Sequence, residues 1–121
     1  MPHEDEPHFV NVADDVFGDY LGEGWSEGPR GLRAMNGAAG VRMGGPRNAA
    51  EQLYIGVFET RDVHLSVSAN GTALPVELVS RNTDLSEYRA ILPAAAVTWK
   101  EMEVSLRAGR PPVLFGYLEV R

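Results

Sequence analysis

The sequence predicts an all-β protein folded as one antiparallel β-sandwich of about eight strands. Thirteen glycines and eight prolines are spread through the 121 residues as breaks between short apolar stretches, in the way that turns separate strands. Several of these stretches alternate apolar and polar side chains, which is typical of a strand with one buried face. An Asn-Gly pair at 70–71 joins two of them and indicates a β-hairpin.

The predicted strands are apolar or alternating runs bounded by turn residues. They comprise 8–12, 31–35, 38–43, 53–58, 63–69, 72–79, 87–92, 101–107 and 113–120. The run at 53–58 is continuously apolar, which favours a central strand covered on both faces. Gly56 and Gly116 interrupt apolar strands and predict bulges or close backbone approach. Residues 93–97, a proline followed by alanines, are the one candidate for a helical turn.

The hairpin around residues 70–71 also predicts its own register. A two-residue loop pairs residues whose numbers sum to 141. The pairs expected on the buried face are Val67 with Leu74, Leu65 with Val76, and Val63 with Leu78. On the other face His64 is expected opposite Glu77. Because Pro75 has no N–H to donate, its strand is expected at a sheet edge or with a bulge.

Length and composition predict a single acidic domain. A chain that is 44% apolar over 121 residues has enough material for one core and too little for two. Seventeen acidic against eleven basic residues give a net charge of −6, and no run of 18 apolar residues occurs, which argues against nucleic-acid binding and against a membrane span. Residues 1–7 are expected to form a flexible acidic tail before a domain at 8–121. Without a basic, apolar leader, a cytoplasmic location is expected.

The sequence predicts no cofactor. The absence of cysteine excludes thiol nucleophiles, iron–sulfur clusters and thiolate zinc sites. Three scattered histidines are too few for an ordinary zinc site. A calcium site assembled from distant loop oxygens leaves no short motif and stays open.

Residues 24–28 match the G-x-S-x-G pattern that presents a nucleophilic serine, here Ser26. The context of that motif is missing, because Pro29 follows where a helix should begin and His64 is the only downstream histidine. We therefore interpret the segment as a glycine-rich loop that carries Trp25. The sequence predicts a protein that is not an enzyme.

The aromatic residues give the indication of a ligand. Flat aromatic rings stack on sugar rings, while nearby polar groups bond the sugar hydroxyls. Most aromatic side chains in a small sandwich are expected in the core. Trp25 and Trp99 both stand beside loops, so they are the best candidates for exposure.

Short motifs spread over residues 17–121 resemble a known kind of accessory domain. They are Gly24-Trp25 with Glu27, Leu32-Arg33-Ala34-Met35, the strand at 53–58, the hairpin at 67–71, Ile91-Leu92-Pro93 and Leu114-Phe115-Gly116-Tyr117. On these the chain resembles the galactose-binding-like jelly rolls found beside bacterial glycosyltransferases and related cell-surface polysaccharide enzymes. The resemblance implies a non-catalytic sandwich that binds carbohydrate. Those relatives usually have an aromatic residue after the arginine that here is Arg33, whereas this chain has Ala34.

The leading hypothesis is a non-catalytic jelly-roll module that binds carbohydrate or serves bacterial polysaccharide metabolism. Its predicted ligand-binding residues are Trp25, Glu27, Arg33 and Trp99. The alternative is a protein-interaction or structural module, including one that forms a homo-oligomer, whose exposed sheet face or acidic N-terminal segment contacts the partner. Ligand identity and oligomeric state stay open.

Overall fold

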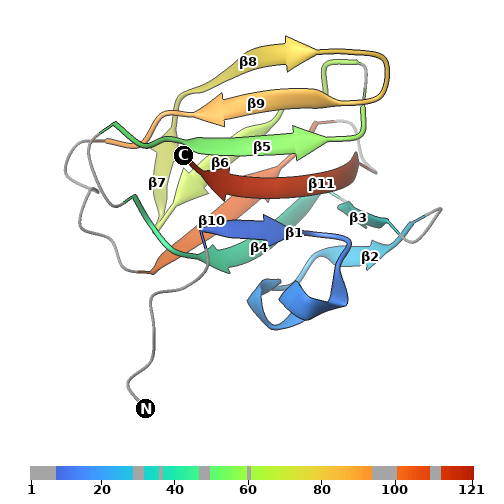
Figure 1. The fold of residues 1–121 in the computed structure, drawn as a ribbon, viewed down its shortest axis with the longest axis horizontal. Helices are drawn as coiled ribbons and strands as arrows, with labels where there is room; N and C mark the ends of the chain where they lie inside the picture. Colours follow the sequence, from blue (N-terminus) through green and yellow to red (C-terminus); the bar gives the residue numbers. More distant parts are fainter. Residues whose placement is uncertain are drawn as a thin grey trace.

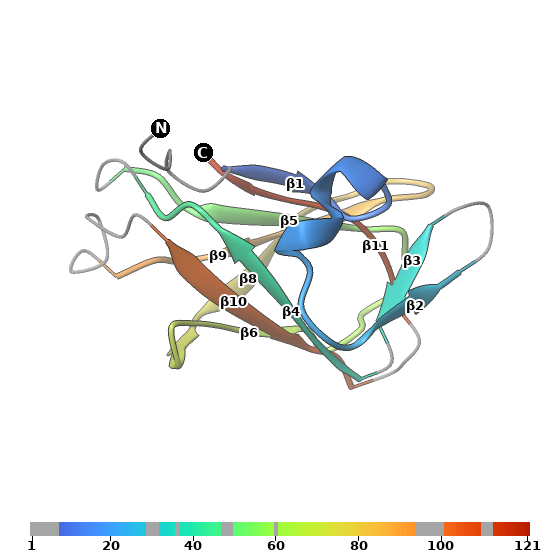
Figure 2. The same cartoon turned by 90° about the horizontal axis from the view of Figure 1, so that it is seen from below.

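The computed structural model describes residues 8–28, 32–35, 37–46, 50–59, 61–93, 101–109 and 113–121. These residues form two antiparallel sheets that pack face to face (Figures 1 and 2), so the predicted all-β sandwich is confirmed. The described segments hold eleven strands. This is more than predicted, because residues 25–27 pair as a strand and one predicted hairpin arm divides in two.

The elements in chain order are β1 (Phe9–Asn11), the 3₁₀ helix η1 (Asp15–Tyr20), β2 (Trp25–Glu27), β3 (Arg33–Met35), β4 (Ala38–Met43), β5 (Leu53–Val57), β6 (Ser66–Ala69), β7 (Thr72–Leu74), β8 (Val76–Arg81), β9 (Ser86–Ala90), β10 (Met102–Arg107) and β11 (Val113–Val120). The larger sheet has the order β2-β3-β11-β5-β9-β8, and β1 also pairs with β11. The smaller sheet has the order β4-β10-β6-β7.

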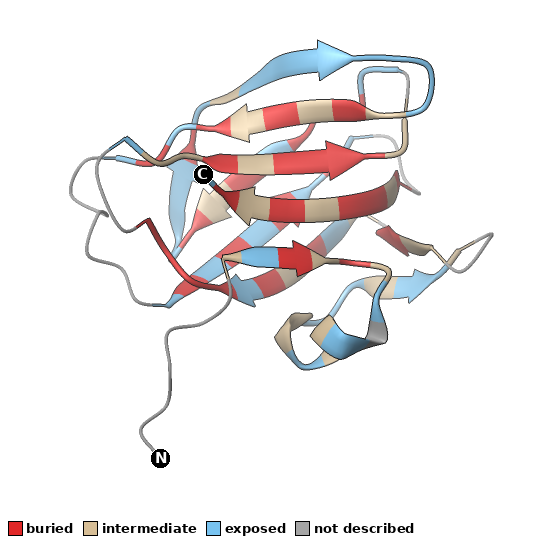
Figure 3. Cartoon of the chain, viewed as in Figure 1, coloured by how far each residue is buried: buried red, intermediate tan, exposed pale blue. Residues whose placement is uncertain are grey.

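The core lies between the two sheets and follows the alternation of the sequence. In β10, Met102, Val104 and Leu106 are buried while the residues between them are exposed. The central strand β5 is buried at Leu53, Ile55 and Val57, and Figure 3 shows the same banding along β11. Each large apolar side chain buried in this way contributes about 1.5–3 kcal/mol, so the two inward faces supply the main stabilisation of the domain.

The tip of the predicted hairpin is confirmed. Ala69 pairs with Thr72, and Val67 pairs with Leu74. Asn70 and Gly71 have φ angles of 50° and 83°, which is the positive pair that a type I′ turn requires. The register predicted from a two-residue loop therefore holds as far as Leu74.

Beyond Leu74 the predicted register is wrong, because the chain leaves the smaller sheet at Pro75. Residues 76–81 form β8, which pairs with β9 at the edge of the larger sheet. His64 consequently does not face Glu77, whose partner across the strands is Arg89. Leu78 is 47% exposed instead of buried. A proline cannot continue the hydrogen-bond ladder, so the strand divides there. The edge position of β7 and β8 and a bulge between Leu78 and Ser80 agree with the expectation from Pro75.

Of the two glycines in the apolar strands, Gly116 has a predicted role, whereas Gly56 makes room for a side chain. The pairing of β11 with β5 shifts register between Phe115 and Tyr117, so Gly116 sits in a bulge. Gly56 lies directly under the ring of Tyr117. A Cβ added to Gly56 would lie 2.2 Å from Cε1 of that ring.

The 3₁₀ helix η1 was not predicted. Its first turn is capped by Asp14, whose Oδ1 accepts a hydrogen bond from the Val16 N–H at 3.0 Å. Residues 94–100, which include most of the predicted helical turn, lie outside the described residues. Within the part of the chain that is described, no helix is long and apolar enough to cross a membrane.

Candidate functional site

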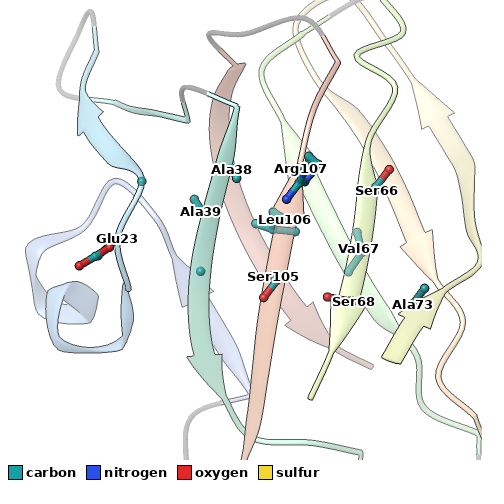
Figure 4. A pocket seen from close by; sticks show the side chains of 12 residues that line it. Glu23, Ala38, Ala39, Ser66, Val67, Ser68, Ala73, Ser105, Leu106 and Arg107 are labelled. Carbon is teal, nitrogen blue, oxygen red and sulfur yellow. The ribbon is translucent and has the colours of Figure 1, made fainter. Parts of the chain in front are cut away.

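A wide groove lies on the outer face of the four-stranded sheet (Figure 4). Its volume is about 730 Å³, and it is more open than enclosed. Its floor is built from β4, β10, β6 and β7, and residues 23–24 form one side. Ligand sites in proteins typically measure about 300–1,000 Å³, so the groove is large enough for a small ligand or a segment of a polymer.

The groove exists because the outward side chains of these strands are small. Ser105 in β10 pairs with Gly40 of β4 on one side and with Ser68 of β6 on the other. In the next outward row Ala38 and Ser66 are small and flank the long side chain of Arg107. Small residues leave the sheet backbone open to contact, while the serine hydroxyls offer both donors and acceptors.

The segment at residues 22–24 forms the side of the groove by running along the free edge of β4. The Gly22 N–H donates to the Gly40 carbonyl at 2.8 Å, and the Gly40 N–H donates to the Glu23 carbonyl at 3.2 Å. Gly24 has a φ of +102°, and a Cβ there would lie 2.0 Å from the Ala38 carbonyl oxygen. Only glycine allows this close approach, and it places the exposed Glu23 beside the groove.

Two charged residues line the groove, Arg107 on the interior strand β10 of the floor and Glu23 at one side. The guanidinium of Arg107 makes no hydrogen bond or ion pair with any described residue, and neither does the carboxylate of Glu23. Figure 4 shows Glu23 on one side of the floor and Arg107 above the central strand. In Figure 4 the Glu23 carboxylate lies on the side of its loop away from the floor, so Arg107 is the charged group that the groove presents beside its serine hydroxyls.

A smaller hollow of about 230 Å³ adjoins the groove and shares Gly40 and Ser105 with it. It is lined by Tyr20 at the end of η1, and the guanidinium carbon of Arg42 lies 5.5 Å from the centre of the Tyr20 ring. Glu103 stands opposite Arg42 across the strands. The hollow therefore places the aromatic ring of Tyr20 beside the groove on the outer face of the four-stranded sheet.

Three of the residues predicted to bind ligand come together on the two-stranded ribbon of β2 and β3. Glu27 pairs with Arg33, and Trp25 is two residues from Glu27 on the same face. Glu27 is exposed and Arg33 is half-buried. None of the three lines the groove. The fourth predicted residue, Trp99, lies outside the described residues.

The side chain of Trp25 is engaged in the fold. Its Nε1–H donates to the Gly40 carbonyl at 2.9 Å. Its ring packs edge-on against Phe115, with 5.3 Å between ring centres. Arg33 likewise donates from Nη1 to the carbonyl of Val12. These contacts tie the ribbon to the core, while Trp25 stays partly accessible.

Ser26 lies in the extended strand β2, and its Oγ donates to the Ala34 carbonyl at 3.4 Å. It does not occupy the strand-to-helix turn that a nucleophile elbow requires, which agrees with the sequence context. His64 contacts Asp62, with 3.6 Å between Nδ1 and Oδ2. Among the described residues, no three His, Asp or Glu side chains gather in a way that could hold a metal ion.

A polar cluster on the outer face of the larger sheet links Glu87, Tyr117 and Arg121. The Tyr117 hydroxyl donates to Glu87, and Arg121 Nη2 donates to the same carboxylate at 2.7 Å. Burial alone would raise the pKa of Glu87, but these hydrogen bonds and the charge of Arg121 outweigh it and lower that pKa below its usual value. Burial and the hydrogen bond to Glu87 raise the pKa of Tyr117 to about 12.

This cluster predicts an acid-sensitive stability. The pKa of Glu87 is lower in the folded protein than in the unfolded chain. The ionised carboxylate therefore stabilises the fold above the usual glutamate pKa of about 4.3, and this stabilisation is lost as the pH falls below that value. Glu87→Gln is therefore expected to flatten the decline in the free energy of unfolding below that pH. Urea unfolding at a series of pH values measures it. Glu77→Gln, which removes an exposed ion pair with Arg89, is the control and should leave the decline unchanged.

No protein-family model and no curated protein matches the amino-acid sequence. Solved structures do match over almost the whole chain. A family 6 carbohydrate-binding module from Bacillus halodurans that binds β-1,3-glucan has a TM-score of 0.56 and 11% identity, and the match covers 98% of each chain. The chain has the β-sandwich fold of that module.

Two enzymes contain a similar domain as part of a longer chain. A family 115 4-O-methyl-α-glucuronidase with specificity for decorated arabinogalactans matches with a TM-score of 0.59 and 11% identity, over 98% of this chain and 18% of its own. An acetyl xylan esterase from the rumen bacterium Butyrivibrio proteoclasticus matches with a TM-score of 0.55 and 12% identity, over 92% of this chain and 31% of its own. The chain thus spans a minor part of either enzyme.

Sequence reasoning missed the groove. Its signal was the row of small side chains at the outward positions of three strands, Ser66 and Ser68 in β6, Ser105 in β10 and Gly40 in β4. The alternation predicts a solvent-exposed face for the serines, whereas the glycine-rich residues around Gly40 favour a flexible connection. Their convergence depends on which strands are neighbours, which the alternation alone does not specify.

Proposed function

We propose that this chain is a non-catalytic carbohydrate-binding module whose ligand lies in the groove on the outer face of the four-stranded sheet. The observation that carries the proposal is the groove itself, about 730 Å³ with a floor of small residues and serine hydroxyls. The proposal moves the binding site from the β2–β3 ribbon, where the sequence suggested it, to the opposite side of β4.

The chemistry of the groove suits a sugar. Sugar hydroxyls both donate and accept hydrogen bonds, and the serine hydroxyls of the floor do the same. Arg107 on β10 adds charged donors to the floor. The small outward residues allow the apolar face of a sugar ring to approach the sheet closely, and Tyr20 in the adjoining hollow offers a ring for stacking.

The fold likeness supports the same class of ligand. The Bacillus halodurans module binds β-1,3-glucan, and the two enzymes act on decorated arabinogalactans and on acetyl xylan by their names. At 11–12% identity no residue role is carried over from them. They define the three polysaccharide types that a binding assay should include first.

We expect weak binding, because an open groove on a small domain cannot enclose its ligand. The expected dissociation constant lies between millimolar and micromolar, which is about −4 to −8 kcal/mol. Isothermal titration with soluble β-1,3-gluco-, xylo- and arabinogalacto-oligosaccharides measures it. Saturable binding of at least one of them is the expected result.

The substitution Ser105→Trp tests whether the groove is the site. A tryptophan at the centre of the floor fills the space that the ligand needs, so binding is expected to fall below detection. Ser80→Trp is the matched control, because Ser80 is an exposed serine of β8 in the other sheet and should leave the affinity unchanged. Circular dichroism confirms that both variants are folded. Equal affinity of the two variants would exclude the groove.

A protein-interaction role is the second candidate, and the edge strand β8 favours it. Leu78 is 47% exposed and Val79 is 45% exposed on a strand that pairs with β9 alone. An exposed apolar edge strand is a surface on which another chain can pair. Two results together would favour this role. The protein would self-associate in sedimentation experiments and lose this association in the Val79→Lys variant, and it would show no response to any sugar.

A further inference from the structure

A third cavity, separate from the groove and its adjoining hollow, lies where the segment leading into β6 meets β8 and β9. It encloses about 310 Å³. It shares no lining residue with the groove. One wall is apolar and includes Leu65 and Leu78, while Arg81 and Tyr88 bring polar groups to it.

Arg81 is held in a fixed orientation at this cavity. Its Nε–H donates to the Ser86 hydroxyl at 2.9 Å, and Nη2 donates to the Tyr88 hydroxyl at 3.2 Å. Both partners are anchored, because Ser86 is fully buried and Tyr88 is 5% exposed. The remaining nitrogen, Nη1, makes no hydrogen bond within the described ranges. Part of a positioned guanidinium is therefore left for a ligand.

Tyr88 supplies a second donor. Its hydroxyl oxygen accepts the hydrogen bond from Arg81, but its own proton has no acceptor among the residues that the structure describes. Tyr88 as a whole residue is 5% exposed, and a buried tyrosine hydroxyl usually donates as well as accepts, because an unmet buried donor costs free energy. The Tyr88 side chain lines the cavity, so a ligand there is placed to accept this proton.

We propose that this cavity binds an organic carboxylate whose body presents apolar C–H groups. A carboxylate is an acceptor with two oxygens, which match the free Nη1 of Arg81 and the hydroxyl of Tyr88. The permanent charge of Arg81 compensates the negative charge of the ligand. Leu65 and Leu78 contact the C–H groups of that body. This site is independent of the sugar groove.

The other charged groups at the cavity form a pair of their own. Asp62 Oδ1 accepts the His64 N–H at 2.9 Å, and Asp62 Oδ2 lies 3.6 Å from His64 Nδ1. Both side chains are about 60% exposed, at 60% for His64 and 64% for Asp62. Because Asp62 is turned toward His64 and toward solvent, its charge opposes the ligand less than that of Arg81 attracts it.

The carboxylate could belong to a free organic acid or to a uronic acid of a glycan, and two probes distinguish these sources. Isobutyrate represents the first and glucuronate the second. Isobutyramide and glucose are the uncharged counterparts. In amide chemical-shift titrations at constant ionic strength, we expect at least one carboxylate to shift residues 62–65, 78–81 and 88, and its uncharged counterpart to bind at least about tenfold more weakly.

Two variants test the assignment of the donors. Tyr88→Phe removes only the hydroxyl and Arg81→Gln removes the charge, and each is expected to weaken binding of the carboxylate by about tenfold or more. Arg61→Gln, an exposed arginine that does not line the cavity, is the control and should bind as the unmodified protein does. Ser105→Trp should also bind the carboxylate normally, which separates this site from the groove.

The proposal is overturned by any of three results. The first is equal binding of a carboxylate and its uncharged counterpart. The second is no saturable shift around the cavity at tens of millimolar ligand, the upper end of weak binding. The third is tighter binding of inorganic phosphate than of either carboxylate, which would assign the donors to a different anion.

Discussion

Replacement of Phe115 by alanine is expected to lower the free energy of unfolding by about 3–5 kcal/mol. Phe115 is fully buried in β11, at the point where that strand pairs with both β3 and β5. Its ring also supports Trp25, with 5.3 Å between the ring centres. The substitution therefore leaves a cavity in the core and removes one of the contacts that hold the β2–β3 ribbon.

Urea unfolding followed by far-ultraviolet circular dichroism measures this loss. Phe9→Ala is the matched control, because Phe9 is 42% exposed on the edge strand β1. Its ring contacts Phe17 and Tyr117. Because the residue is already partly exposed, removing the ring should lower the free energy of unfolding by only on the order of 1 kcal/mol. Similar losses for the two variants would contradict the position of Phe115 in the core.

The substitution Gly24→Ala is expected to cost about 2–4 kcal/mol, because it combines backbone strain with a steric conflict. Gly24 has a φ of +102°, and a Cβ would lie 2.0 Å from the Ala38 carbonyl oxygen. That oxygen belongs to the backbone of β4 and cannot move aside as a flexible side chain would. The segment at residues 22–24 must then lift away from the sheet, and the side of the groove would be displaced with it.

A second glycine separates the two causes. Gly37 has a φ of +103°, nearly that of Gly24, but a Cβ there would meet nothing within 4 Å. Gly37→Ala should therefore cost only the backbone strain, roughly 1–2 kcal/mol. The difference between the two variants in urea unfolding measures the steric conflict. Equal losses in the free energy of unfolding for the two variants would contradict the close approach of Gly24 to β4.

The strands were predictable from the sequence because their signal is local. The alternation in β10 and the continuous apolar run of β5 depend on residues next to one another, and the structure places both as expected. The Asn-Gly turn likewise specifies its own backbone angles and the first pairs beside it. Each of these features is decided within a few residues.

The division at Pro75 was not predictable in the same way. The residues after Pro75 alternate between apolar and polar, as they would in a strand of either sheet. Val76 packs against the core from β8, and it would also face the core if it continued the hairpin in the smaller sheet. Proline indicated an edge or a bulge, but not the sheet to which the following strand belongs. The choice depends on pairing with β9, which is a contact outside the local pattern.

The position of Trp25 could not be predicted from its glycine-rich surroundings, because it also depends on contacts distant in sequence. Flanking glycines indicated a loop, whereas β2 pairs with β3 and the indole contacts Phe115, a residue near the other end of the chain. The groove also depends on distant pairing, because Gly40, Ser68 and Ser105 come from three separate strands. Such convergence is visible only once the order of the strands is known.

Mapping of a sugar titration onto the backbone amides tests the central claim most directly. Soluble β-1,3-gluco-, xylo- and arabinogalacto-oligosaccharides would each be added to the labelled protein while its amide shifts are recorded. We predict saturable shifts confined to β4, β10, β6, β7 and residues 20–24 around the groove. Shifts concentrated on β2 and β3 would instead place the ligand beside Trp25, Glu27 and Arg33, and no saturable shift with any of the sugars would contradict the carbohydrate-binding function.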